Sequence, residues 1–166
     1  FFNFDNDDTQ VTLVVTLPDG SVRTEYYSIS SLSVLDMHKE STATAETISV
    51  THGNDRFNFT QTTTLPLDVR FARITQKITT DNPAVTLVSI EFGLHTKGEP
   101  KVGANHVYVA FIDQPMKSIG HIMFPDRQSR PSSIKTDASP VELVYALDGK
   151  RSAEFSYFMG VYQYTD

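Results

Sequence analysis

The sequence predicts an all-β protein, an antiparallel β-sandwich of jelly-roll-like character with eight to ten short strands. Three observations support this fold class. Ser and Thr supply 34 of the 166 residues, and Phe and Tyr supply 18 more. With the many Val and Ile residues, they fit a pleated, half-buried sheet surface. Short runs of alternating apolar and polar residues are separated by turn residues, which favours a sandwich or barrel over alternating strands and helices.

A hairpin over residues 11–28 is the clearest element. Val11, Leu13, Val15 and Leu17 alternate with Thr12, Val14 and Thr16, and the alternation resumes from Val22 to Tyr27. Between the two runs stands Pro18-Asp19-Gly20, in which proline presets φ and glycine accepts a positive φ. The pattern predicts two antiparallel strands joined by a short turn.

Residues 30–46 are irregular, and residues 47–59 predict a second hairpin. Residues 32–37 are compatible with either a strand or one helical turn, and residues 41–45 indicate a loop. Two strand-like runs follow, from Thr47 to Val50 and from Phe57 to Phe59, with His52-Gly53-Asn54-Asp55 between them. Gly, Asn and Asp are typical turn residues, so we expect a hairpin here.

The middle of the chain predicts two further strands. The alternation of residues 69–78 slips near Ala72, which predicts a β-bulge. Asp81-Asn82-Pro83 predicts a turn. Residues 85–94 predict a strand with Val88, Ile90, Phe92 and Leu94 on one face.

The last third predicts four strands and two loops. Residues 96–105 and 125–140 are rich in polar residues, Gly and Pro, and we expect both to be loops. The expected strands are residues 106–112, 119–124, 141–147 and 155–164. The last two form a final pair, divided by Asp148-Gly149-Lys150.

Length and composition limit the possible functions. One domain spanning residues 1–166 is expected, and the abrupt start at Phe1 suggests a fragment of a longer chain. The absence of Cys excludes disulfides and thiolate chemistry, and no apolar run is long enough to span a membrane. The net charge of −6 arises within the first fifty residues, which hold eight acidic and two basic residues. Nucleic acid is therefore an expected partner only if a basic arm is missing from this chain.

The motifs that carry catalysis are absent, so we expect a protein that is not an enzyme. The eight glycines form no phosphate-binding loop, and no G-x-S-x-G motif occurs. No cofactor is expected, apart from a weak indication of calcium. This indication rests on Asp5, Asp7 and Asp8, which supply the oxygen ligands that calcium prefers but lack the EF-hand spacing.

Aromatic residues gather at both ends of the chain. Both faces of the last expected strand carry apolar residues, which is typical of a strand covered on both sides or docked on a partner. An alternative is a stacking platform for sugar rings or bases. We expect assembly contacts at Phe1, Phe2, Phe4, Phe158, Tyr162 and Tyr164.

Residues 86–122 contain a pattern of two strands around a glycine-bearing loop. The strands are Leu87 to Phe92 and Val107 to Asp113, and the loop is Gly98 to Gly103. This stretch resembles the central strands of single jelly-roll coat proteins of small RNA viruses. It is also similar to the core of plant-virus movement proteins, in which Asp113 would match a characteristic Asp. The resemblance implies a non-enzymatic capsid or capsid-protrusion domain, located in the virion, with copies of itself as partners.

A second hypothesis is a carbohydrate- or receptor-binding β-sandwich on a viral or bacterial surface. Asn, Asp and Arg provide the directional hydrogen bonds that sugar hydroxyls need. The expected binding loops contain His52, Asn54, Asp55, Arg127 and Arg130. The location would then be extracellular or at the cell surface.

Overall fold

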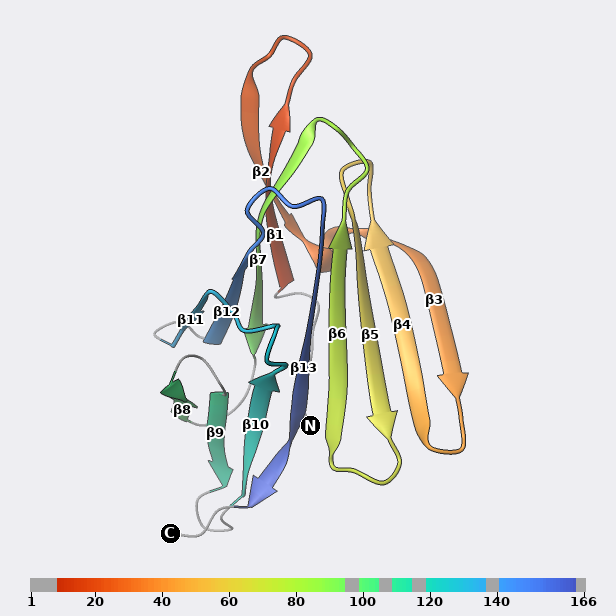
Figure 1. Cartoon of the computed structure of the whole chain (residues 1–166), viewed down its shortest axis with the longest axis vertical. Coiled ribbons are helices and arrows are strands. Elements are labelled where there is room, and N and C mark those ends of the chain that lie inside the picture. The colour runs from red at the N-terminus through yellow and green to blue at the C-terminus, as the bar shows by residue number, and fades with distance from the viewer. Residues whose placement is uncertain (1–8, 95–98, 105–108, 115–118, 137–140, 164–166) are drawn as a thin grey trace.

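Two antiparallel sheets make up the protein. The computed structural model describes residues 9–94, 99–104, 109–114, 119–136 and 141–163. A five-stranded sheet has the order β11-β12-β7-β1-β2, and an eight-stranded sheet has the order β3-β4-β5-β6-β13-β10-β9-β8 (Figure 1). The predicted β-sandwich is confirmed. The described sheets hold more strands than the eight to ten expected, and β3 to β6 form a meander, an order that differs from the paired Greek keys of a jelly roll.

The strand bounds show how the chain divides between the sheets. The five-stranded sheet contains β1 (Thr9–Thr16), β2 (Val22–Ser28), β7 (Val85–Leu94), β11 (Ser133–Lys135) and β12 (Val141–Ala146). The eight-stranded sheet contains β3 (Ser33–Ser41), β4 (Ala45–Gly53), β5 (Asn58–Pro66), β6 (Phe71–Thr79), β8 (Glu99–Val102), β9 (Val109–Gln114), β10 (Ile119–Pro125) and β13 (Ser152–Gln163). The 3-10 turn η2 (Ile29–Ser31) carries the chain from the first sheet to the second.

Both predicted hairpins form. In the β1–β2 hairpin Gly20 has a φ of 82°, the left-handed conformation that glycine adopts without strain. The β4–β5 hairpin is closed by Asn54, whose side-chain oxygen accepts the backbone N–H groups of Arg56 and Phe57. Both turns therefore use the residue types that the sequence analysis identified.

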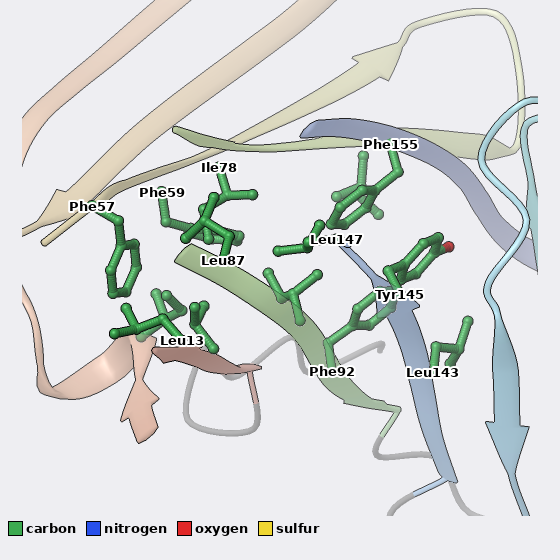
Figure 2. Packing of buried hydrophobic residues seen from close by; sticks show 14 of the residues in the cluster. Leu13, Phe57, Phe59, Ile78, Leu87, Phe92, Leu143, Tyr145, Leu147 and Phe155 are labelled. Carbon is green, nitrogen blue, oxygen red and sulfur yellow. The ribbon is translucent and has the colours of Figure 1, made fainter. Parts of the chain in front are cut away.

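The core lies between the two sheets. Val11, Leu13 and Val15 of β1 are at most 2% exposed and face residues of the eight-stranded sheet such as Phe59 and Ile78. Figure 2 shows Leu13, Phe59 and Ile78 meeting between the strands. At one end of the core, aromatic rings stack in series: Phe155 on Tyr145 at 4.2 Å between ring centroids, Tyr145 on Phe92 at 5.7 Å, and Phe92 on Tyr157 at 5.1 Å.

The predicted bulge near Ala72 is wrong, because β6 pairs without a register shift with β5 and β13. The apparent slip arises because Phe71 is an apolar residue on the outer face, whereas Gln76 is a polar residue on the inner face, 1% exposed. A real irregularity lies in β7. Its register against β1 shifts between Thr12 and Leu13, which leaves Val88 out of the pairing and 39% exposed. The expectation that Val88 lies on one face with Ile90 and Phe92 is therefore also wrong.

The last two strands do not pair with each other, although the sequence analysis expected them to. Strand β12 pairs with β7 in one sheet, and β13 pairs with β6 and β10 in the other. The turn at Asp148 and Gly149, both with positive φ, leads from one sheet to the other. The two expected loops also contain short strands, β8 and β11, which add edge strands to each sheet.

Candidate functional site

A polar pocket lies where the β4–β5 and β6–β7 loops meet. It has a volume of about 200 Å³, and its lining includes Asn54, Asp55, Arg56, Asn58, Asp81 and Asn82. The sequence analysis expected Asn54 and Asp55 at a ligand-binding loop, and the structure places both at this pocket.

Much of the hydrogen-bonding capacity around this pocket is used to hold the two loops together. The Asn82 Nδ2 group donates to the backbone oxygen of Asp55 at 3.1 Å, and its Oδ1 atom accepts from the backbone of Ala84 at 3.0 Å. The Thr80 hydroxyl donates to the backbone oxygen of Arg56 at 2.6 Å. The amides of Asn54 and Asn82 therefore serve the fold, whereas the Asp55 carboxylate, which is 78% exposed and 3.2 Å from Arg56 Nη1, faces solvent.

A cluster of charged side chains joins this loop to the edge of the smaller sheet. Glu25 on β2 accepts hydrogen bonds from Tyr27 Oη at 2.6 Å and from Arg23, and its carboxylate lies 3.4 Å from Arg56 Nε. The hydrogen bond from Tyr27, together with the two guanidinium groups, lowers the pKa of Glu25, although its desolvation opposes the shift. Burial and the neighbouring carboxylate raise the pKa of Tyr27. Tyr27 therefore keeps its proton and Glu25 keeps its charge. The ion pair between Glu25 and Arg56 links the two sheets.

The eight-stranded sheet extends beyond the sheet that covers it. Strand β3 is exposed along its whole length, and Figure 1 shows β3 and β4 on the side away from the five-stranded sheet. The register places Met37 beside Val50 and Ile48 beside Thr63, on the face that Ile74 buries in the core.

On this face we call the apolar residues Val34, Met37, Ile48 and Leu65 the overhang. They are 54%, 67%, 40% and 47% exposed, respectively. The overhang continues the inner, core-facing surface of the sheet into solvent. Apolar side chains grouped on one sheet face are typical of a surface that another protein part covers.

The outer face of the same sheet is polar over β4 and β5. Hydroxyl pairs bridge neighbouring strands at Thr47 and Thr64 (3.3 Å), at Thr51 and Thr60 (2.9 Å), and between Ser49 and Thr62. Cross-strand hydroxyl pairs of this kind contribute to strand pairing. The high Thr and Ser content of the sequence is therefore concentrated partly on one sheet face.

The other expected binding residues are not all at the pocket. His52 lies in β4 and is 8% exposed, so its placement in a loop is wrong; the β4 strand continues through His52 because its side chain packs on the inner face beside Phe59. Arg127 and Arg130 are exposed after β10, in a segment bonded to Ser156 of β13. Strands β5 and β6 separate that segment from the β4 strand, so the two expected binding loops do not form one site.

Only one of the expected assembly and calcium residues has a described side chain. Phe158 lies on the outer face of the eight-stranded sheet, and its assembly contact stays a prediction. Phe1, Phe2, Phe4, Tyr164 and the calcium candidates Asp5, Asp7 and Asp8 lie outside the described residues, and so does the side chain of Tyr162. Within the described ranges, no three His, Asp or Glu side chains gather as a metal site.

Sequence reasoning missed Glu25, Tyr27 and Arg56, which form the charged cluster. Glu25 and Tyr27 share one face of β2, and this spacing was visible in the sequence. Their partner Arg56 lies on a loop of the other sheet, so no sequence signal connected them. In the described part of the chain, no helix is long and apolar enough to cross a membrane.

The structure defines the chain as an antiparallel β-sandwich with one sheet wider than the other. No protein-family model matches the sequence, and no curated protein matches it.

Solved structures that share the fold include two sugar-active enzymes. The heparan sulfate lyase HepC from Pedobacter heparinus matches with a TM-score of 0.57 and 8% identity over 93% of this chain. A putative kojibiose phosphorylase from the human microbiome matches with a TM-score of 0.54 and 10% identity over 92% of this chain. The chain spans 24% of the lyase and 21% of the phosphorylase. At these identities the matches show a shared fold alone, and the coat-protein resemblance stays a prediction that they do not test.

Proposed function

We propose that this chain is a non-catalytic β-sandwich domain of a larger carbohydrate-active protein, and that its role is to dock on another part of that protein. In this proposal the overhang packs against another part of the same polypeptide. The observation that carries it is the exposed apolar face formed by Val34, Met37, Ile48 and Leu65. Covering such a face removes apolar surface from water, which favours docking by about 25 cal/mol for each Å² buried.

The comparisons support the proposal in two ways. Both matching structures bear the names of proteins that act on sugars, a heparan sulfate lyase and a kojibiose phosphorylase. In each of them more than three-quarters of the chain lies outside the matching part, so the β-sandwich is one portion of a longer molecule. The side-chain amide of Asn82 at the polar pocket is already hydrogen-bonded to backbone groups, which also favours a structural role over catalysis.

The experiment compares the isolated chain with the protein encoded by its complete reading frame. The double variant Met37→Lys/Ile48→Lys removes the apolar character of the overhang. We expect the isolated chain to keep its Tm within about 2 °C, because substitutions at exposed positions rarely change stability by more than about 0.5 kcal/mol. In the longer protein we expect the double variant to raise hydrogen exchange in β3–β5 and to lower the Tm of that protein.

A matched control carries the same charges on the opposite face of β3. Ser33→Lys/His38→Lys lies on the outer face, at exposed positions, and should leave the hydrogen exchange of β3–β5 unchanged. The proposal fails if the reading frame encodes no further residues. It also fails if β3–β5 exchange equally fast in the isolated chain and in the longer protein.

The coat-protein hypothesis is a second proposal, and the same overhang supports it. An assembling subunit also exposes apolar strand surface, and a second copy of the chain would then cover it. Light scattering of the isolated chain distinguishes the two proposals. Concentration-dependent assembly that Met37→Lys/Ile48→Lys abolishes would favour the coat-protein hypothesis, whereas a monomer at all concentrations would favour the domain of a larger protein.

A further inference from the structure

Three phenylalanines form a patch on the outer face of the eight-stranded sheet, away from the core. Phe158 of β13 lies between Tyr157 and Met159, which are 0% and 3% exposed and point into the core. Because side chains alternate along a strand, Phe158 points outward. The register pairs Phe158 with Phe124 of β10 and pairs Gly160 with Phe71 of β6. We call Phe71, Phe124 and Phe158 the outer aromatic patch.

The patch is ordered by ring contacts and by a glycine beneath it. Phe124 stacks on Phe158 at 5.2 Å between centroids, and Phe71 meets Phe124 edge-to-face at 5.4 Å. A Cβ on Gly160 would lie 2.3 Å from the Phe71 ring, so the ring rests over the bare backbone. All three side chains stay partly exposed. The arrangement therefore presents aromatic surface to solvent from three rigid strands.

Basic residues lie on the strands and the segment next to the patch. Arg73, exposed, lies directly opposite Phe158 on β6, and Lys77 is exposed on the same face. The segment with Arg127 and Arg130 is held beside β13, because the backbone N–H of Asp126 donates to the oxygen of Ser156 at 2.8 Å and the N–H of Ser156 donates to Ser129 Oγ at 2.9 Å.

Two acidic residues reduce the positive charge of this region. Glu154 pairs with Lys77 in the β6–β13 register, and Asp126 lies in the segment after β10. Among the described residues, no ion pair neutralises Arg73, Lys77, Arg127 or Arg130. The region around the patch therefore has an excess of positive charge, although the whole chain carries −6.

Aromatic rings and free guanidinium groups together match one ligand chemistry. An aromatic face packs against the apolar C–H face of a pyranose ring, whereas guanidinium groups bind carboxylate or sulfate oxygens in a bidentate manner. We propose that the outer aromatic patch and its cations bind an acidic polysaccharide, a chain of sugar rings that carry carboxylate or sulfate groups.

This inference rests on the proposed role in a carbohydrate-active protein, but it uses the opposite face of the sheet from the overhang. The two can therefore fail separately. Loss of polysaccharide binding with intact docking of the overhang would refute this inference alone. Failure of the docking experiment, with polysaccharide binding intact, would refute the proposed function alone.

The test measures binding of the 166-residue chain to a heparin-derived decasaccharide, to a hyaluronan decasaccharide and to a neutral dextran oligosaccharide by isothermal titration calorimetry. We expect at least one acidic probe to bind and the neutral probe not to bind. Arg73→Gln and Phe158→Ala should each weaken that binding about tenfold, the effect of losing one charged hydrogen bond or one stacked ring.

Two control variants remove a cation or an aromatic ring at positions away from the outer aromatic patch. Lys39→Gln removes an exposed cation on the inner face of β3, and Tyr26→Ala removes an aromatic side chain that is 73% exposed on β2. Both should leave the affinity within about twofold. If Phe158→Ala fails to fold, Phe158→Leu keeps the apolar volume and removes the ring, and it should show the same loss of binding.

Nuclear magnetic resonance of the unmodified chain places the ligand independently of any variant. We expect backbone shifts in β6, β10 and β13 on titration with the bound probe. The proposal is overturned by any of three results: no binding of either acidic probe at millimolar concentration, equal losses in the control variants, or shifts confined to the loops around Asn54 and Asn82.

Discussion

Tyr145 carries a hydroxyl group that the fold buries without compensation. The side chain is 6% exposed, and no described residue hydrogen bonds to its Oη atom. An unsatisfied buried polar group costs about 1–3 kcal/mol. Tyr145→Phe removes this group and keeps the ring, which stacks on Phe92 and Phe155. We therefore expect the free energy of unfolding to rise by about 1–3 kcal/mol.

Urea unfolding followed by circular dichroism measures this change, and thermal unfolding should show a Tm higher by about 2–4 °C for each kcal/mol. Tyr157→Phe is the matched control. Its hydroxyl accepts a hydrogen bond from Gln76 Nε2 at 3.4 Å, so the substitution removes a hydrogen bond of the kind that Tyr145 lacks and should not stabilise the protein. A Tyr145→Phe variant less stable than the parent would refute the reasoning.

The same variant makes a prediction for alkaline pH. Burial raises the pKa of Tyr145 and of Tyr157 above the ordinary value of 10. Their contribution to stability is complete below pH 10 and is lost as the pH rises from 10 toward the folded-state pKa, because the unfolded chain releases these protons first. In that window each such tyrosine lowers the free energy of unfolding by about 1.4 kcal/mol per pH unit. Tyr145→Phe should therefore reduce the pH dependence of unfolding above pH 10, and an unchanged slope would contradict the burial of its hydroxyl.

Three further predictions concern the fold. Phe59→Ala empties a fully buried core position and should lower the free energy of unfolding by about 3–5 kcal/mol in urea titrations; a loss below 1 kcal/mol would mean that the two sheets do not enclose Phe59. Gly160→Val drives a side chain into the Phe71 ring and should cost about 1–3 kcal/mol, with a changed near-ultraviolet circular dichroism signal; an unchanged spectrum would show that the ring does not lie over Gly160. Gly20→Ala meets no neighbouring atom but has a φ of 82°, so it should cost about 1 kcal/mol and Gly20→Asn less; equal stability of the two variants would argue against the left-handed turn.

Sequence patterns located local structure well where one face of a strand is polar. The alternation in β1 identified Val11, Leu13 and Val15 as a buried face, and all three are core residues. The β1–β2 turn was also predictable, because Gly20 is needed for its positive φ. Prediction failed where a strand carries apolar side chains on both faces or a polar one inside, as with Phe71 and Gln76 of β6.

The functional surfaces were less accessible to sequence reasoning. Asn54 and Asp55 were predicted at a binding loop because their residue types suit turns and hydrogen bonds, and they do line the pocket. Arg56 escaped notice, because its partner Glu25 lies on the other sheet. The outer aromatic patch likewise joins three strands that lie far apart in the chain, so only part of it, Phe158, was identified.

The sequence by itself determined that this protein is a sandwich of antiparallel strands, because alternation with period two is a local property of the chain. Only the tertiary structure decided which strands pair. It sent β12 and β13 to different sheets and gave one sheet more strands than the other can cover. That inequality leaves the overhang exposed on one face and the aromatic patch on the other. Both surfaces depend on long-range pairing, which the alternation of side chains does not encode.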